Sequence, residues 1–202
     1  NNYTLNPQEL RRAEFDGEFL KLSEKIAAFD FWKEHNYFSS SDIRRMKDIS
    51  FISSLLIFLR FGIEGEITST GINKAYEYYN ENYPQKDEDE NIFSTILQQI
   101  NKIIDGDDNR LNFLKRTVHF YTLFTALYPI VKEHSNTQSH HIKNYQKFID
   151  LYDNEPDMKK FFGDILYKEI EQYKLKTQEG TAQRANRVHR FTVIQKILRF
   201  VK

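Results

Sequence analysis

The most apolar stretch of the chain lies at residues 48–61 and reads DISFISSLLIFLRF. Its hydrophobic side chains recur on nearly all sides of a helix rather than along one stripe, which is typical of a helix enclosed by others. Gly62 and Gly65 follow it and are expected to end it. We therefore expect residues 48–61 to form the central, most buried helix of the fold.

Amphipathic patterns at three- and four-residue spacing predict further helices on both sides of this stretch. Asn6, Pro7 and Glu9 have the residue types of an N-cap, a first helical position and a capping box. Later patterns predict helices over about 19–31, 72–83, 92–104, 111–134, 142–152, 156–173 and 181–201. Pro129 is expected to kink the helix over 111–134 or to end it one residue early. The fold class is therefore all-α: a single bundle of about eight helices over residues 1–202, with orthogonal or irregular packing.

The composition excludes several classes of protein. Seven glycines and four prolines in 202 residues argue against a turn-rich barrel and against a Gly-rich phosphate loop. Lys+Arg and Asp+Glu are equal at 29 each, so no net field draws the chain to nucleic acid or to a membrane. The absence of cysteine excludes disulfides and thiol nucleophiles. No apolar run reaches the ~18 residues of a membrane span, so we expect a cytoplasmic protein without a membrane partner.

Metal and cofactor sites are not expected. His140 and His141 are adjacent, so their side chains diverge by about 100° on a helix, and His134 lies beyond a predicted loop. The acidic runs 87–90 and 105–108 lack the ligand spacing of a calcium loop. We interpret 87–90 as an exposed connection, and both runs as acids placed favourably before a helix. No Walker loop, GxGxxG, GxSxG or SxxK motif is present.

The C-terminal segment carries a concentrated positive charge. From residue 174 onward eight bases, the last of them Lys202, face one acid, a balance of eight minus one, or about +7. Arg184, Arg187 and Arg190 recur every three residues and share one helical face, with Arg199 further along. One interpretation is that these side chains bind the phosphates of DNA. The alternatives are that they pair with the acidic runs 87–90 and 105–108 of the same fold or are solvated.

The same segment contains Arg184 and His189 in the sequence RANRVH. An arginine and a histidine at this spacing resemble the active-site motif of HEPN ribonucleases, which are all-α. The resemblance implies that His189 acts as acid and base and that Arg184 stabilises charge on phosphorus. Ala185 departs from that family, which usually has a polar residue after the arginine.

The opening of the chain carries a more specific resemblance. Residues 5–13 read LNPQELRRA and are followed by GEF at 17–19; RMKD at 45–48 leads into the apolar stretch, and GT at 180–181 precedes RVHRF at 187–191. These segments resemble the GmrSD-type family of bacterial restriction and phage-defence proteins, which contains domain of unknown function 262. The resemblance implies catalysis by an N-terminal ParB/sulfiredoxin-like domain with a DGQQR-like motif for nucleotide hydrolysis and DNA nicking. That motif does not occur in residues 1–202. We therefore expect the C-terminal helical portion of a longer protein, and no catalytic residue is carried over.

The family-like segments suggest scaffold roles for six residues: Asn6, Pro7, Glu9, Arg12, Arg45 and Asp48. Glu9 is placed to cap its helix or to pair with Arg12, and Arg45 and Asp48 are expected to pair within one helix. These roles fit a junction with the N-terminal domain.

The function expected from the sequence is a non-catalytic helical domain that supports this N-terminal partner domain and contacts DNA through the last helix. Two alternatives remain open: a HEPN-like ribonuclease using Arg184 and His189, and a protein-interaction module with aromatic faces. A homo-oligomer is also an open alternative.

Overall fold

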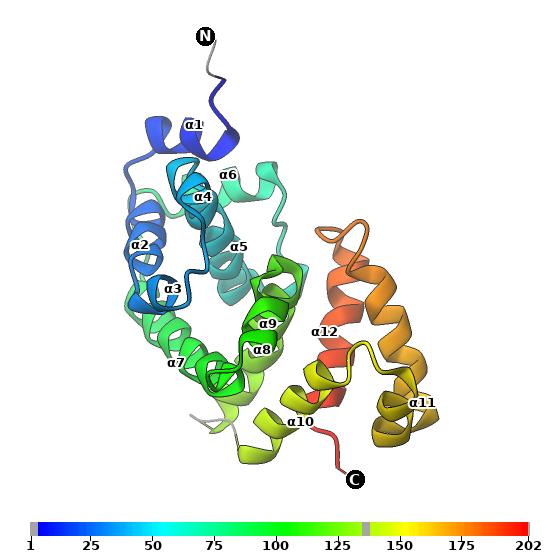
Figure 1. The fold of residues 1–202 in the computed structure, drawn as a ribbon. Helices are drawn as coiled ribbons and strands as arrows, with labels where there is room; N and C mark the ends of the chain where they lie inside the picture. The colour runs from blue at the N-terminus through cyan, green and yellow to red at the C-terminus, as the bar shows by residue number, and fades with distance from the viewer. Residues whose placement is uncertain (1–3, 135–137, 202) are drawn as a thin grey trace. The chain divides into compact units, whose positions relative to one another are not determined.

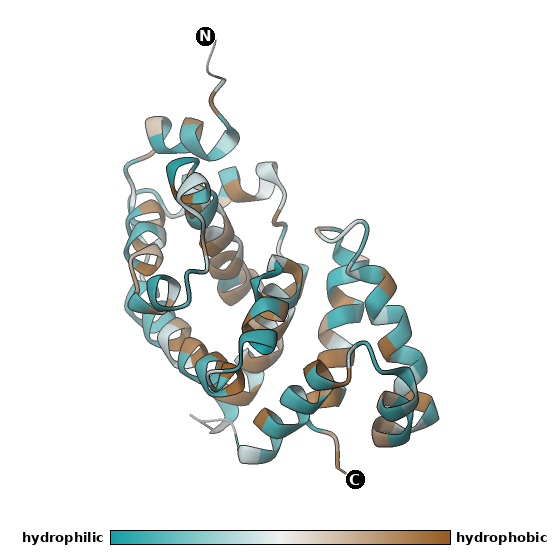
Figure 2. Ribbon diagram, viewed as in Figure 1, coloured by the Kyte–Doolittle hydropathy of each residue, from teal (hydrophilic) through white to brown (hydrophobic). Residues whose placement is uncertain are grey.

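Helix α5 (Lys47–Phe61) is the central helix of the first part of the structure, as its sequence predicts. The computed structural model describes residues 4–134 and 138–201, and its contacts divide the chain into two compact units, 1–93 and 94–202. Helix α5 packs against α1, α2, α4 and α6, and Ile52, Leu55 and Leu56 have no exposed surface. Figure 2 shows hydrophobic residues along this helix. Because α5 is apolar on several sides, it requires neighbours on several sides.

The first unit is built from short helices around α5, and the last of them continues into the second unit (Figure 1). They are α1 (Pro7–Glu14), α2 (Glu18–Ala27), α3 (Asp30–Glu34), α4 (Ser40–Arg44), the 3-10 helix η1 (Gly62–Glu64), α6 (Ser69–Tyr78) and α7 (Lys86–Ile104).

The second unit is centred on its last helix, which packs against α9, α10 and α11. Its helices after α7 are α8 (Asp108–Lys115), α9 (Thr117–His134), α10 (Ser139–Asp150), α11 (Glu155–Lys176) and α12 (Arg184–Leu198). Val193, Ile194, Ile197 and Leu198 of α12 are buried. Lys202, counted among the basic residues of the sequence, lies outside the described residues.

The all-α class is confirmed for the described residues, which contain helices and no strand. The helix number is wrong: these residues form twelve α-helices rather than about eight. Helices α3 and α4 have five residues each, too few for periodicity to reveal. The predicted helix over 111–134 is two helices, because Arg116 adopts an extended conformation between α8 and α9. Helix α9 does not end before Pro129 but continues to His134. The single domain over 1–202 stays a prediction, since a division by contacts does not show how the units fold.

The acidic run 87–90 is not the exposed connection that the sequence predicts. Helix α7 begins at Lys86, and Asp89 in its first turn has no exposed surface. The Asp89 carboxylate accepts hydrogen bonds from the Arg60 guanidinium of α5 and from the Tyr83 hydroxyl. Burial raises the pKa of Asp89 to about 6, although Tyr83 and Arg60 both favour the ionised form.

Asp89 should make the stability of the chain depend on pH between about 4 and 6. The folded chain binds the Asp89 proton more tightly than the unfolded chain, so this contribution is complete below pH 3.8 and is lost as pH rises through about 6. We expect wild-type unfolding free energy, relative to Asp89→Asn, to fall by up to about 3 kcal/mol from pH 4 to pH 7. Urea unfolding at four pH values measures this difference, and a difference independent of pH would contradict the assignment.

Candidate functional site

The family-like segment at the start of the chain forms a capped helix that is tied to the rest of the first unit. Asn6 Oδ1 accepts hydrogen bonds from the backbone N–H groups of Gln8 (2.8 Å) and Glu9 (3.0 Å), and Glu9 Oε2 accepts one from the Asn6 N–H at 2.6 Å. Pro7 occupies the first turn. This capping box confirms the predicted helix start.

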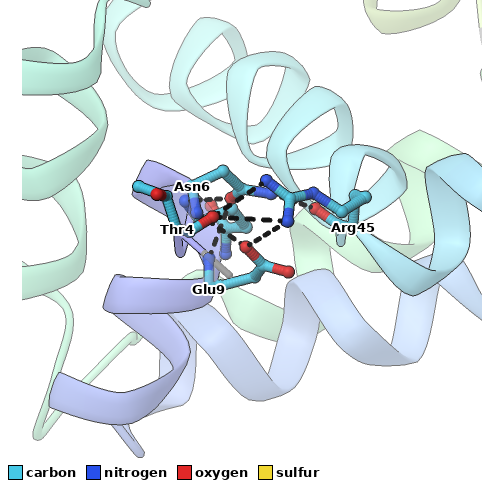
Figure 3. Close-up of polar contacts among 5 residues, drawn as sticks. Thr4, Asn6, Glu9 and Arg45 are labelled. Atoms are coloured by element: carbon cyan, nitrogen blue, oxygen red, sulfur yellow. Dashed lines mark hydrogen bonds and ion pairs between the residues drawn. The ribbon is translucent and has the colours of Figure 1, made fainter. Parts of the chain in front are cut away.

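The same cap also holds the end of α4 (Figure 3). Asn6 Nδ2 donates to the backbone carbonyl of Arg45 at 2.7 Å, and the Arg45 guanidinium pairs with Glu9 at 3.4 Å. Both Arg45 Nη atoms also lie 3.4 Å from the backbone carbonyl of Thr4. Asn6 and Glu9 therefore have two roles: they cap α1, and they bind Arg45, the residue that follows α4.

Glu9 caps its helix rather than pairing with Arg12, and the predicted pair of Arg45 with Asp48 is not formed. Arg12 pairs with Glu24 of α2 at 2.7 Å instead of with Glu9. Arg45 and Asp48 do not share a helix, because Met46 between them adopts a left-handed conformation with φ of 53°. The Asp48 carboxyl is buried, and this burial raises its pKa. Its Oδ1 atom has no hydrogen-bond partner among the described residues.

The face of α1 that contacts the unit is polar, while two leucines beside it are exposed. Gln8 and Arg11 are 2% and 3% exposed, whereas Leu5 and Leu10 are 46% and 51% exposed. Hydrophobicity alone therefore does not identify the inward face of α1, which carries Gln8 and Arg11.

Gln8 begins a chain of buried hydrogen bonds that joins four helices. Its Nε2 donates to the Tyr76 hydroxyl of α6 at 2.8 Å, and that hydroxyl lies 3.0 Å from the Ser53 hydroxyl of α5. Ser53 in turn lies 3.3 Å from the Ser23 hydroxyl of α2. Each buried polar atom in this chain thereby has a partner, which avoids the cost of an unsatisfied group.

Arg11 is buried next to this chain and is held by uncharged atoms. Its Nη2 donates to the backbone carbonyl and the hydroxyl of Ser69 at 3.0 and 2.6 Å. Its Nε donates to Asn73 Oδ1 and its Nη1 to Gln8 Oε1. Burial lowers the pKa of Arg11, because the charged form loses its hydration. The motif LNPQELR thus directs its polar side chains into the first unit.

The basic face predicted for the last helix does not lie on the surface. Arg187 and Arg190 of α12 are 3% and 1% exposed. Arg190 donates to the backbone carbonyls of Lys176 and Thr181, both at 2.8 Å, and to the Thr122 hydroxyl at 3.2 Å. The prediction that Arg184, Arg187 and Arg190 bind phosphates together is wrong, because two of the three are enclosed.

Arg187 and the two outer arginines have separate surroundings. Arg187 donates to the backbone carbonyl of Ala182 and to the Tyr121 hydroxyl, both at 3.1 Å. Arg184 is exposed, and Arg199 pairs with Glu133 at 3.2 Å. Arg187 and Arg190 therefore hold the connection between α11 and α12, a role that neither the DNA interpretation nor its alternatives included.

His189 of α12 is half-buried. Its Nε2 atom is buried and has no hydrogen-bond partner among the described residues, and burial lowers the pKa of His189. The geometry therefore gives no support to the HEPN-like pairing of Arg184 with His189, which stays an untested hypothesis.

The other histidines do not assemble a metal site in the described part of the chain, where no group of three or more His, Asp or Glu residues is placed to hold an ion. His141 is buried beside the exposed His140. The side chain of His134 lies outside the described residues. His119 is fully buried with its Nδ1 atom 2.7 Å from the Tyr173 hydroxyl, and burial lowers the pKa of His119 to about 3, so it is neutral at pH 7.

Comparison with known proteins found no relative of this chain. The chain matches no protein-family model, and it has no significant match among curated proteins or solved structures. None of the helices in residues 4–134 and 138–201 is long and apolar enough to cross a membrane.

Replacing Asn6 should loosen α1 selectively. In Asn6→Ala the helix loses its N-cap and the bond to the Arg45 carbonyl, so we expect a loss of about 1–2 kcal/mol in unfolding free energy. Asn154→Ala is the matched control, because Asn154 caps the exposed start of α11. Limited proteolysis within residues 4–17 should accelerate in Asn6→Ala alone. Equal acceleration in both variants would contradict the specific anchoring of α1.

Replacing Arg190 should destabilise the second unit. Arg190→Met keeps an extended side chain but leaves the carbonyls of Lys176 and Thr181 without this donor, so we expect a loss of about 2–4 kcal/mol. Arg184→Met removes the same charge from an exposed position and should change stability by less than about 0.5 kcal/mol. Chemical unfolding of both variants tests this, and similar midpoints would refute the structural role of Arg190.

Proposed function

We propose that the chain is a non-catalytic helical support within a GmrSD-like restriction or phage-defence protein. In this role it holds the polypeptide entering at LNPQELR in a fixed position relative to the first unit, next to a ParB/sulfiredoxin-like nuclease domain. The observation that carries the proposal is the inward direction of the polar residues of this motif. Gln8 and Arg11 are buried, and Asn6 and Glu9 bind Arg45.

The contacts of α1 support a stiff joint rather than a flexible linker. A flexible linker would expose its polar side chains to water, whereas α1 uses them in hydrogen bonds to α6 and to Arg45 at the end of α4. Each bond has a defined direction, so together they fix both the position and the rotation of α1. Such a joint transmits the orientation of one domain to the next.

The proposed function does not include contact with DNA through the last helix, α12. Arg187 and Arg190 already donate to backbone carbonyls within the second unit. Exposing them would break the connection that they hold. Only Arg184 and Arg199 of the four arginines remain at the surface, and Arg199 has a carboxylate partner.

An exposed aromatic cavity favours a second candidate function, a protein-interaction module. A cavity of about 460 Å³ in the first unit is lined by Phe61, Tyr78, Ile57 and Ala75, among others. Phe61 and Tyr78 are 48% and 74% exposed. Large exposed aromatic side chains beside a cavity are typical of binding surfaces.

The supporting role predicts that the purified chain neither hydrolyses nucleoside triphosphates nor cuts DNA. We expect phosphate release with ATP or GTP and Mg²⁺, and nicking of a supercoiled plasmid, to equal those of a buffer blank. The wild-type chain and the His189→Ala variant are also tested on single-stranded RNA. The ribonuclease alternative requires that the wild-type chain cleave this RNA and that the variant lose the cleavage. Metal-dependent hydrolysis by the wild-type chain would refute the supporting role.

The gene region upstream of residue 1 provides an independent check. The proposal requires that it encode a ParB/sulfiredoxin-like domain with a DGQQR-like motif in the same reading frame. A stop codon directly upstream, or an unrelated domain there, would remove the family part of the proposal while leaving the anchoring of α1 intact.

A further inference from the structure

A cavity of about 360 Å³ lies beside the anchored helix α1 in the first unit. Its wall comes from the beginnings of three helices: Asn6 to Gln8 at the start of α1, Lys47 and Ser50 at the start of α5, and Ser69 and Ile72 at the start of α6. Helix starts carry unpaired backbone N–H groups and a partial positive charge. The starts of three helices therefore meet at one cavity, although the first-turn N–H groups of Gln8 and Glu9 in α1 already bind the Asn6 side chain.

The side chains around this cavity add positive charge. Arg11, Arg45 and Lys47 line it, and none of the residues that line it is acidic. Glu9 and Asp42 pair with Arg45 and Lys47 from outside the lining. Arg11 differs from both, since its hydrogen-bond partners among the described residues are all uncharged. The buried charge of Arg11 is therefore not neutralised by these contacts.

Donor groups remain for a ligand in this cavity. The four bonds of Arg11 use at most four of the five N–H donors of its guanidinium. The N-cap residue of α5, Met46, provides no side-chain cap for the first turn of that helix. Ser50 and Ser69 also line the cavity, and the Ser69 hydroxyl accepts a hydrogen bond from Arg11. Cationic side chains, hydroxyls and helix starts together form the donor set that binds phosphoryl oxygens.

We propose that this cavity binds the phosphoryl group of a small organic phosphate. The cavity volume falls within the range of small-molecule sites, about 300–1,000 Å³. Pro7, Ile67 and Ile72 supply an apolar surface for the organic part of the ligand. A dianionic phosphoryl group would offset the charge of Arg11 and face Lys47.

Binding would be coupled to the anchoring of α1. The α1 segment forms one wall of the cavity, and the starts of α5 and α6 form the rest together with Arg45 and Ile67. The complete cavity therefore exists only when α1 is docked. A ligand that binds only the docked form stabilises that form. This inference goes beyond the supporting role, because it requires the docked helix and not the neighbouring domain.

The test titrates the purified 202-residue chain with phenyl phosphate, inorganic phosphate and short single-stranded DNA, monitored by backbone amide chemical shifts. Phenyl phosphate is expected to shift the amides in the first turns of α1, α5 and α6 saturably and more tightly than inorganic phosphate does. Lys47→Glu should weaken its binding by about tenfold, because a cation facing the phosphoryl group becomes an anion.

Lys74→Glu is the matched control. Lys74 lies on α6 outside this cavity, and its exposed side chain pairs with Glu66 as that of Lys47 pairs with Asp42. We expect its binding of phenyl phosphate to stay within about twofold of wild type, since only the general field of the protein changes. Unchanged unfolding midpoints of both variants establish that they are folded.

Phenyl phosphate should also slow proteolysis within residues 4–17 of the wild-type chain and not of Lys47→Glu. Three outcomes would overturn the proposal: no saturable shift at millimolar phenyl phosphate, an equal loss of affinity in both lysine variants, or tighter binding of the single-stranded DNA at the same amides. If the chain bound inorganic phosphate as tightly as phenyl phosphate, the proposal of an organic ligand would be overturned, and the cavity would be assigned to the free phosphate ion.

Discussion

The structure depends on one constraint: a guanidinium group removed from water must find enough oxygen atoms to replace its hydration. Arg11 in the first unit and Arg190 in the second are almost completely buried, and the hydrogen-bond partners found for both are uncharged. Taking a charge out of water is costly unless it is well hydrogen-bonded. Their partners include Ser69, 58 residues from Arg11, and Thr122, 68 residues from Arg190. Satisfying each arginine therefore fixes how those segments meet.

This constraint produces the same arrangement in both units: a buried arginine joins two helices through a backbone carbonyl. Arg11 ties α1 to the start of α6 through Ser69, and Arg190 ties α12 to the end of α11 through Lys176. The carbonyls at a helix C-terminus carry partial negative charge, which makes the Lys176 carbonyl a favourable partner for a cation. Both arginines are consequently structural, although the sequence predicts Arg190 to lie on a phosphate-binding surface. The charge of Arg11 also contributes to the cavity that we assign to a phosphoryl group.

The sequence predicted the parts of the fold that depend on local chemistry. The capping box of Asn6 and Glu9 forms as predicted, because its donors and acceptors lie within four residues. The burial of α5 also follows from its own composition. The pairing of Arg45 with Asp48 is predicted wrongly, because Arg45 reaches Glu9 on another helix. Of the two roles open to Glu9, the structure contains the cap, and Arg12 pairs with Glu24 of α2. The sequence places Asp89 in an exposed connection. Its local pattern does not reveal the partner Arg60, because that residue lies 29 residues away.

By itself, the sequence determined that the described chain is helical and that residues 48–61 form a buried helix, because both properties follow from the period and the amount of apolar surface. Only the tertiary structure decided which polar residues are enclosed. Leu10 is exposed while Arg11 next to it is buried, and Arg184 is exposed while Arg187 and Arg190 are buried. The physical reason is that a polar group can be buried only where other segments supply hydrogen-bond acceptors for it. The sequence around the residue does not indicate where those segments lie in the fold.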